Sequence, residues 1–360
     1  MKRFLVVLVG VLALVGVGAL VGGVWLTRQY AVAGPGATPV RVQVEPGTTV
    51  RVVFARLAAQ GVLRHPRLTE LYLRLHGRRL AIKAGEYEIA AHATPAAIVT
   101  MLAEGRVVLE QLTVVEGTTF DDLRASLESH PKVRATLKGR SDEAVMAAIG
   151  HAGEFPEGRF FPDTYRFAGG TSDVEILRLA YEQMQQYLQQ AWSQREPGLP
   201  LHSAYEALTL ASIIEKETGL AAERPRIAGV FTNRLRKGMR LQSDPTVIYG
   251  LGAQYDGSIH ERDLVTDTPY NTYTRGGLPP TPIALPGREA LLAAVRPEDT
   301  GALYFVATGA GDGAHHFSAT LEEHNQAVQQ YLARLRAQGA IPAKAAPDAA
   351  KTRGGAAHPP

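Results

Sequence analysis

The chain has 360 residues, of which 45% are hydrophobic and 20% are charged, and its formal net charge is +3. This composition is that of a globular protein with enough apolar residues for one large core or two smaller ones. Lysine and arginine look scattered and do not alternate with aromatic residues, so a nucleic-acid partner is poorly supported. The lack of cysteine excludes disulfides, thiolate metal sites and a cysteine nucleophile.

The N-terminal segment predicts a membrane anchor. Lys2 and Arg3 precede 23 uncharged residues, 4–26, which as a helix would extend about 34 Å and span a bilayer core. Trp25 lies where an interfacial aromatic side chain is expected, and the basic N-terminus predicts a single pass through the cell inner membrane with the N-terminus cytoplasmic. A cleaved signal peptide is the alternative, because Ala31-Val32-Ala33 resembles a cleavage site. Both readings place residues 34–360 outside the cytoplasmic membrane.

The next hundred residues predict small strand–helix units. After a Pro- and Gly-rich linker, alternating apolar residues from Val40 predict a half-buried strand, and a second strand is expected at 86–89. Helices are expected over 50–60, 66–78 and 95–104, the last between a Thr94 cap and Gly105. A Gly-Thr-Thr turn between a strand and a helix occurs twice, at 47–49 and 117–119. This echo indicates either related modules or simply a common turn.

The sequence changes character near residue 113. Helices are expected over 173–192, 204–218, 224–237 and 321–335, and a strand over 303–307. Residues 241–287 are rich in Gly, Pro, Asn, Thr and Tyr and also hold large apolar side chains, which favours a functional loop. The segment 338–360 has few large apolar residues and is expected to be disordered.

Two glutamates on the helix expected at 204–218 are candidates for acid–base chemistry. The helix is apolar almost all round, which predicts burial, and burial raises the pKa of a carboxyl group toward the range that a general acid needs. Glu215 and Glu217 lie on nearly opposite faces, so periodicity cannot choose between them. The structural alternative is an ion pair of either glutamate with Lys216, Arg234 or Arg236.

The loop segments suit carbohydrate binding, because amides, hydroxyls and Tyr rings between prolines supply directional hydrogen bonds and a stacking platform. A well-capped structural loop is the alternative. Other chemistries have little support. His315 and His316 are adjacent on an expected strand and point to opposite faces, so they would chelate one ion poorly. No G-x-S-x-G elbow indicates a serine nucleophile.

Several sequence blocks together resemble the endolytic murein transglycosylase family, also called YceG-like. The blocks occur in the family's order: EGRFFPDTYRF (157–167), ASIIEKET (211–218), ERPRIAGVFTNRLRKGMRLQSDPTVIYG (223–250), YNTYTRGGLPPTPI (270–283) and HHF…EHN (315–325). The resemblance covers roughly residues 40–335.

The resemblance implies an α+β fold in which a transmembrane helix precedes a small LysM-like α/β module and a larger mixed α+β catalytic domain. The expected boundaries are 1–30 for the anchor and its flank, 31–39 for the linker, 40–112 for the LysM-like module, 113–337 for the YceG-like domain and 338–360 for the tail. The implied partners are peptidoglycan glycan strands and the cytoplasmic membrane, with peptidoglycan synthases as further candidates.

The activity that the resemblance implies is lytic cleavage of the β-1,4 bond between N-acetylmuramic acid and N-acetylglucosamine, leaving a 1,6-anhydro end. The family's catalytic glutamate falls on Glu215, and neither a metal nor a cofactor is expected. Candidate substrate-binding residues are Asn233, Gln242, Asp244, Tyr270, Asn271 and Tyr273. The alternatives are a hydrolase of the same bond and a non-catalytic peptidoglycan-binding scaffold.

Overall fold

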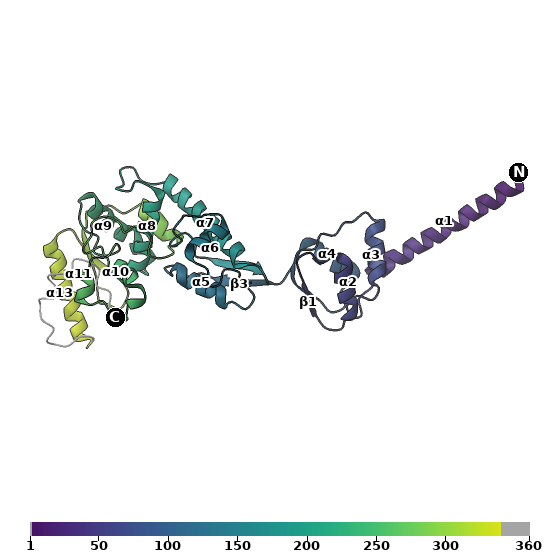
Figure 1. Ribbon diagram of the computed structural model, residues 1–360, viewed down its shortest axis with the longest axis horizontal. Coiled ribbons are helices and arrows are strands. Elements are labelled where there is room, and N and C mark those ends of the chain that lie inside the picture. Colours follow the sequence, from purple (N-terminus) through teal and green to yellow (C-terminus); the bar gives the residue numbers. More distant parts are fainter. Residues whose placement is uncertain (1, 340–360) are drawn as a thin grey trace. The chain divides into compact units, whose positions relative to one another are not determined.

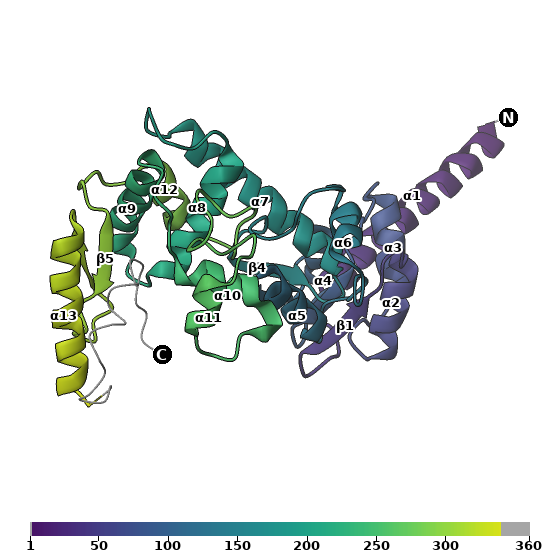
Figure 2. The same cartoon turned by 60° about the vertical axis from the view of Figure 1, so that its left-hand side comes forward.

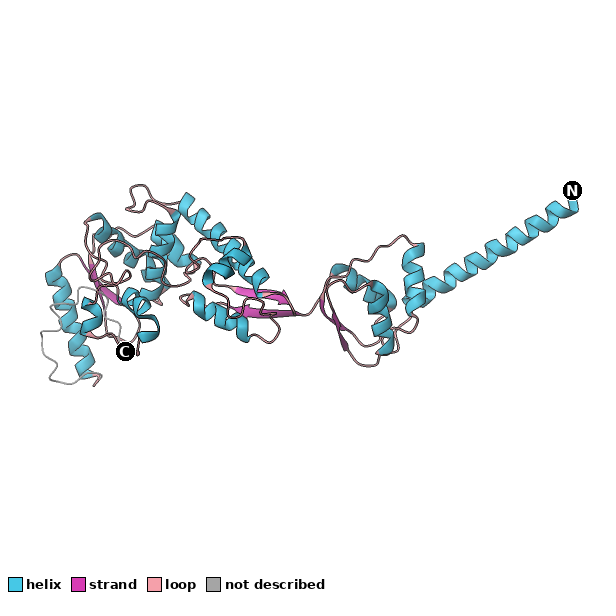
Figure 3. Cartoon of the chain, viewed as in Figure 1, coloured by secondary structure: helices cyan, strands magenta, loops and turns pink. Residues whose placement is uncertain are grey.

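The computed structural model describes residues 2–339 as a mixed α+β chain whose described strands form three two-stranded sheets. Figure 1 shows the elements in chain order, and Figure 3 shows how far helices outnumber strands. Two compact units divide the chain. Unit 1 comprises residues up to 111 together with 166–171, and unit 2 comprises residues 112–165 and those from 172 onward.

Unit 1 begins with α1 (Lys2–Ala31), a helix of 30 residues without an acidic residue in its first turn. It is long and apolar enough to cross a membrane. Its large apolar side chains from Phe4 to Trp25 are exposed, whereas Leu26 is buried against the rest of the unit. The apolar surface of α1 therefore lacks a protein partner over most of its length within the described residues, as a membrane-spanning helix requires.

The module that follows α1 places two helices between two antiparallel strands. Strands β1 (Val40–Val44) and β2 (Gly85–Ile89) pair with Val42 opposite Tyr87, and α2 (Val50–Ala59), α3 (Pro66–Leu75) and α4 (Pro95–Glu104) complete the fold. Val42, Phe54, Leu57 and Tyr87 are among its buried core residues. The predicted strands and helices are confirmed here, including the α4 boundaries, where Thr94 accepts a hydrogen bond from Ala97 N and Gly105 adopts a left-handed conformation.

Residues between α1 and β1 pack against this module. Gly34 N donates to Ala93 O (3.1 Å) and His92 N donates to Gly36 O (2.7 Å). A Cβ atom at Gly34 would lie 2.6 Å from two carbonyl oxygens, those of Ala93 and Val62, so only glycine permits this approach. The glycine at position 34 of this Pro- and Gly-rich segment therefore allows a close backbone contact, in addition to the turn that the composition favours.

Strands β3 (Leu109–Thr113) and β4 (Thr164–Ala168) form the second sheet, and the division between the units falls within both of them. Between these strands unit 2 contains α5 (Phe120–Ser129) and α6 (Asp142–Ile149). Thr119 caps α5, with Asp122 completing a capping box, and Ser141 caps α6. The second Gly-Thr-Thr turn thus does start a helix, as its pattern predicted.

The main core of unit 2 surrounds α8 (Ala204–Glu217). Helices α7 (Asp173–Ser193), α9 (Arg224–Arg236) and α12 (Arg288–Val295) pack against it, with η1 (Ala221–Glu223) leading into α9. Figure 2 shows α8, α9 and α12 side by side. Residues 207–214 of α8 are all buried, which confirms the burial predicted from its apolar pattern. Helix α12 was not anticipated from the sequence.

The segment 241–287 contains helices that the sequence analysis did not foresee. Helix α10 (Asp244–Leu251) has Pro245 in its first turn, and it is followed by η2 (Gly252–Gln254) and α11 (Glu261–Val265). An acidic residue followed by proline is a helix-start signal, which the many surrounding glycines and prolines obscured. The expectation of one continuous loop was therefore wrong.

The C-terminal part of unit 2 is a hairpin covered by a helix. Strands β5 (Tyr304–Ala307) and β6 (His315–Ser318) are antiparallel, with Val306 opposite His316, and α13 (Leu321–Ala337) packs on them. His315 is buried and His316 is exposed, so the two rings do point to opposite faces. Of the tail expected to be disordered, residues 340–360 lie outside the described residues.

Candidate active site

Helix α8 brings Glu215 and Glu217 to its C-terminal turn, where they differ sharply in environment. Glu217 is 0% exposed, whereas Glu215 lies at the border of the core, next to the exposed Lys216. The structure thus distinguishes the two glutamates that the sequence pattern left equivalent.

Glu217 is part of a buried polar network. Ser243 Oγ donates to Glu217 Oε1 at 2.6 Å, and the Arg234 guanidinium exerts a favourable electrostatic effect on the carboxyl group. Burial raises the pKa of Glu217 to about 8, against the opposing effects of the Ser243 hydrogen bond and Arg234. Glu217 is fully buried, and its hydrogen bond with Ser243 connects α8 to the start of α10.

Glu215 is held by two donors from distant parts of unit 2. Gly287 N donates to Oε2 at 2.8 Å, and Arg224 Nη2 donates to Oε1 at 2.8 Å. The Glu215 side chain is 4% exposed. Burial raises its pKa, and the Gly287 hydrogen bond and the Arg224 charge oppose that rise. The net direction, toward a carboxyl group that holds its proton at higher pH, is the one that acid catalysis uses.

The ion pair with Arg224 corrects the structural alternative considered from the sequence. The partner of Glu215 is Arg224, the first residue of α9 directly after η1, not Lys216, Arg234 or Arg236. Lys216 Nζ instead donates to Gly117 O at 3.1 Å. The structure therefore does place Glu215 in an ion pair, but with a partner that the sequence pattern did not indicate.

A second carboxylate, Glu116, lies at the solvent side of this pair. Its Oε2 is 3.6 Å from Arg224 Nη2, and its side chain is 46% exposed. The position of Glu116 is fixed by backbone hydrogen bonds of the Gly-Thr-Thr turn to the 285–287 segment: Gly117 N donates to Leu285 O (2.9 Å) and Leu285 N donates to Thr118 O (2.8 Å). Sequence reasoning missed Glu116, although the repeated turn marked its neighbourhood.

Arg224 is itself anchored through the residue before it. Glu223 accepts hydrogen bonds from His315 N (2.9 Å, to Oε1) and approaches His315 Nδ1 at 2.7 Å through Oε2. The two side chains are 12% and 4% exposed, respectively. This buried contact ties the start of α9 to β6, so the family block that contains His315 supports the ion pair structurally.

Three of the predicted binding residues, Gln242, Asp244 and Tyr273, make side-chain hydrogen bonds near the start of α10. Gln242 Oε1 accepts from Arg234 Nη1 at 3.2 Å, and Gln242 has a positive φ of 52°. Tyr273 Oη donates to Asp244 Oδ1 at 2.5 Å, which joins the loop to the start of α10. These side chains are half-buried, so each keeps an exposed part that could contact a ligand.

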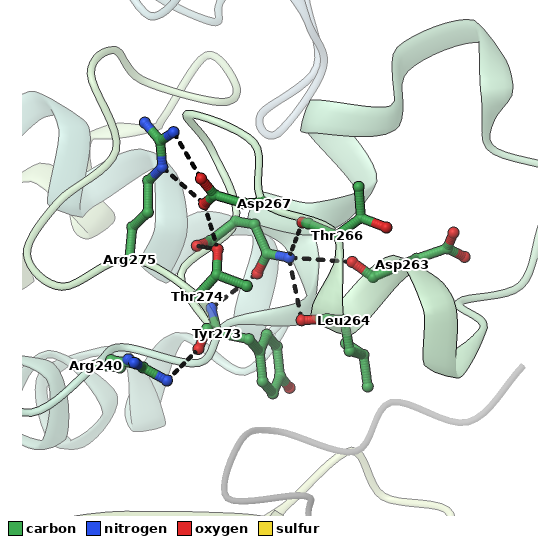
Figure 4. Close-up of polar contacts among 9 residues, drawn as sticks. Arg240, Asp263, Leu264, Thr266, Asp267, Tyr273, Thr274 and Arg275 are labelled. Carbon is green, nitrogen blue, oxygen red and sulfur yellow. Dashed lines mark hydrogen bonds and ion pairs between the residues drawn. The ribbon is translucent and has the colours of Figure 1, made fainter.

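Asn271 organises the loop around itself. Its Nδ2 donates to the carbonyl oxygens of Asp263 (3.0 Å), Leu264 (3.1 Å) and Thr266 (2.7 Å), and its Oδ1 accepts from Tyr273 N. Figure 4 shows these three carbonyl groups converging, with the Arg275–Asp267 ion pair beside them. Asn271 is 1% exposed. Its burial argues for a structural role in place of the sugar contact expected from the sequence.

The last two predicted binding residues, Tyr270 and Asn233, make contacts outside the group of residues around Asn271. Tyr270 Oη hydrogen-bonds Thr281 Oγ1 at 2.9 Å, and its ring packs edge-on against Tyr249. Asn233 Nδ2 donates to Ala302 O at 3.2 Å, which joins α9 to the loop before β5. Asn233 thus has a partner on the β5 side of α9.

Glu157 is a titratable residue that sequence reasoning did not single out. It is 4% exposed, and it accepts hydrogen bonds from Phe120 N (3.1 Å) and Tyr249 Oη (3.2 Å). Burial raises its pKa to about 7. Only its place in the aromatic block 157–165 hinted at importance, because burial of a polar loop residue depends on tertiary contacts.

The chain is a mixed α+β protein with an N-terminal apolar helix. At the edge of its main core lies a carboxyl group, Glu215, whose pKa is raised. The sequence model of the YceG-like family matches residues 42–330. The chain belongs to this family.

Relatives of known annotation agree with that assignment. An endolytic murein transglycosylase of Bacillus subtilis (strain 168) is 31% identical over 82% of this chain and 85% of its own length. One of Streptococcus pneumoniae (strain D39 / NCTC 7466) is 26% identical over 81% of this chain and 58% of its own length. A crystal structure of a Listeria monocytogenes protein described as yceG-like has 31% identity and a TM-score of 0.51, covering 81% of this chain and 99% of that one.

Proposed function

We propose that this protein is a membrane-anchored endolytic murein transglycosylase in which Glu215 is the general acid and base. The family assignment and the two annotated relatives support the activity. The observation that carries the residue assignment is a contrast in surroundings on α8: Glu217 is 0% exposed and hydrogen-bonded to Ser243, whereas Glu215 belongs to an ion-pair cluster that includes the half-exposed Glu116.

In the proposed reaction, the protonated Glu215 donates its proton to the oxygen that links N-acetylmuramic acid to N-acetylglucosamine. The bond from that oxygen to the muramoyl anomeric carbon breaks, and the 6-hydroxyl of the same sugar forms a new bond to this carbon. Glu215 then takes the hydroxyl proton and is an acid again. No water is consumed, so one carboxyl group suffices, unlike the two-carboxylate scheme of most glycosidases.

The ion pair with Arg224 is part of this proposal. In the protein without glycan, Arg224 favours the charged form of Glu215. A glycan strand that draws Arg224 away would leave Glu215 desolvated without its cation, which raises the pKa of Glu215 further. Hydrogen bonds of catalytic groups often rearrange when the substrate binds, so the substrate-free contact is compatible with catalysis.

A hydrolase of the same bond is the second candidate, and Glu116 favours it. This carboxylate belongs to the same ion-pair cluster as Glu215, and a second carboxylate is what a hydrolase needs to activate water or to act as a nucleophile. Glu116→Gln separates the two mechanisms. A transglycosylase should keep most of its activity in this variant, whereas a two-carboxylate hydrolase should lose it.

Product mass decides the reaction class directly. Purified protein incubated with glycan strands should release fragments with a 1,6-anhydro end, which are lighter by one water than hydrolysis products. The Glu215→Gln variant should release neither. Fragments one water heavier would overturn the transglycosylase assignment. Full cleavage by Glu215→Gln would refute the role of Glu215, and the scaffold alternative predicts no cleavage by either protein and unchanged function of Glu215→Gln in cells.

We also propose that α1 anchors the protein in the inner membrane with its N-terminus in the cytoplasm, so that both units face the cell wall. The length and apolar surface of α1 support a single pass, and Lys2 and Arg3 support the orientation. A LysM-like role in glycan binding for residues 40–112 stays a prediction. Detection of an N-terminal epitope in the mature membrane-bound protein would exclude a cleaved signal peptide.

A further inference from the structure

Positive charge is concentrated in one short stretch of unit 1, which corrects the impression that basic residues are scattered. Residues 50–83 contain eight Lys or Arg and one acidic residue, so this stretch carries +7 in a chain whose total is +3. Its seven arginines are all exposed: Arg51, Arg56, Arg64, Arg67, Arg74, Arg78 and Arg79. Glu70 pairs with Arg51 (3.2 Å) and Arg74 (2.6 Å), and it neutralises only one charge.

This basic stretch lies where the apolar helix ends. The ring of Tyr30, at the end of α1, stacks on Tyr72 of α3 with a centroid distance of 3.8 Å. Arg64 and His65 border a small cavity together with Leu26 and Tyr30 of α1. Figure 1 shows α3 beside this end of α1. If α1 crosses a bilayer, α3 and the preceding turn are at the depth of the lipid head groups.

The connection between α1 and the module holds this arrangement. Gly34 and Gly36 hydrogen-bond Ala93 and His92, and Leu26 is buried against the module. The basic stretch therefore cannot move freely away from the helix end, as it could on an extended linker. A fixed position within one Debye length of the bilayer, about 8 Å at physiological salt, is where surface charge acts strongly.

A groove between α2 and α3 combines charge with apolar surface. It has a volume of about 770 Å³, and Arg51, Arg67 and Arg74 line it together with Phe54 and Leu71. Glu70 also lines the groove and pairs with Arg51 and Arg74, so the three arginines leave a net charge of +2 there. Leu71 is 44% exposed, and Leu75, one turn later, is 67% exposed. Arginine binds phosphate oxygens through paired N–H groups, and the apolar lining suits acyl or glycerol carbons. An anionic phospholipid has both a phosphate group and acyl and glycerol carbons, so its chemistry matches this groove.

We propose that α2, α3 and the turns before and after α3 form a docking surface for the anionic phospholipid head groups of the membrane that α1 crosses. This inference rests on the membrane anchorage proposed above. Docking would hold unit 1 against the outer face of that membrane through charges additional to Arg28, the basic residue in the last turn of α1. Clusters of basic residues next to a membrane helix bind anionic lipid surfaces by the same electrostatic attraction.

The test compares two triple variants of the full chain in neutral detergent micelles. Arg64→Gln/Arg67→Gln/Arg79→Gln removes three exposed arginines for which no ion pair is recorded in residues 2–339, so the fold is preserved. Lys138→Gln/Lys237→Gln/Arg262→Gln removes the same charge from exposed positions of unit 2. The measured quantity is the apparent Kd for dioctanoyl phosphatidylglycerol, with dioctanoyl phosphatidylcholine as the neutral probe.

Each arginine near an anionic surface contributes about fivefold, so the first variant should bind phosphatidylglycerol at least tenfold more weakly. The unit 2 variant should stay within twofold of the wild type, and 0.5 M salt should weaken wild-type binding. Equal affinity for the two lipids, or equal losses in both variants, would overturn the proposal. The proposal would also be overturned if the first variant kept its lipid affinity but lost binding to isolated glycan strands.

Flotation with neutral phosphatidylcholine vesicles after an alkaline wash tests anchorage by α1 separately. A chain that does not float refutes the anchor on which the inference rests. A chain that floats but does not discriminate between the two lipids refutes the docking surface alone.

Discussion

Arg224 Nη2 lies 2.8 Å from Glu215 Oε1, so the carboxyl group proposed to carry the reaction is paired with a cation in the substrate-free protein. Two opposing effects act on this carboxyl group. Burial raises its pKa, and the Gly287 N–H and the Arg224 charge lower it. The net effect is a raised pKa, so Glu215 keeps its proton to higher pH than an exposed glutamate does. The Arg224 charge limits how far this pKa rises.

Arg224→Gln should therefore shift the pH profile. Loss of the cation removes an effect that lowers the pKa of Glu215, so the pKa should rise. Because the acid form of Glu215 starts the reaction, the basic limb of kcat/KM should move to higher pH. Arg224→Lys should retain most of the wild-type profile. An unshifted basic limb in Arg224→Gln would show that Arg224 does not act on the catalytic proton.

Glu217→Gln should change how stability depends on pH. The pKa of Glu217 is raised to about 8 in the folded state, so its contribution to stability is fully present below pH 4.5 and is lost as the pH rises toward 8. A glutamine keeps the hydrogen bond to Ser243 without ionising. Between pH 5 and 8, wild type should lose on the order of a few kcal/mol relative to the variant. Parallel denaturant midpoints across this range would contradict the assignment.

Asn271→Ala should destabilise the loop without acting primarily on substrate affinity. The change leaves three carbonyl oxygens and one N–H, in partly buried hydrogen bonds, without their side-chain partner. Each buried group that loses its hydrogen bond costs about 1–3 kcal/mol, so a loss of several degrees in Tm and faster amide exchange across 261–275 are expected. A raised KM with an unchanged Tm would instead support the hypothesis that Asn271 contacts the sugar directly.

Gly229→Ala should destabilise unit 2 through a backbone clash. A Cβ atom at this position of α9 would lie 2.0 Å from Glu298 O, and Glu298 N donates to Pro225 O in the same contact. Overpacking against backbone costs about 1–3 kcal/mol. Gly219→Ala is the matched control, because its Cβ would meet no atom within 4 Å. Equal denaturant midpoints for the two variants would refute the close approach.

Much of the local structure could be predicted because local signals specify it. Thr94 and Gly105 mark both ends of α4, and apolar periodicity located α7, α8 and α9 to within one or two residues. Where local signals were mixed, prediction was wrong: α10 begins at Asp244-Pro245 inside a segment rich in loop-forming residues.

The surroundings of Glu215 could not be predicted, since they depend on tertiary contacts. Gly287 lies 72 residues further along the chain, and Arg224 is brought back by the turn after Thr218. A helical pattern reports which face a residue occupies, not which distant groups meet that face. The same limit explains why the sequence pattern could not separate Glu217 from Glu215. The structure separates them through the hydrogen bond that Ser243 donates to Glu217.

The most direct measurement is the mass of the fragments that the wild type and Glu215→Gln release from the same glycan strands. The proposed mechanism predicts 1,6-anhydro ends from the wild type, no net uptake of water, and at least a thousandfold slower release by a folded Glu215→Gln. Fragments that carry an added water, or a Glu215→Gln variant that cleaves at the wild-type rate, would contradict it.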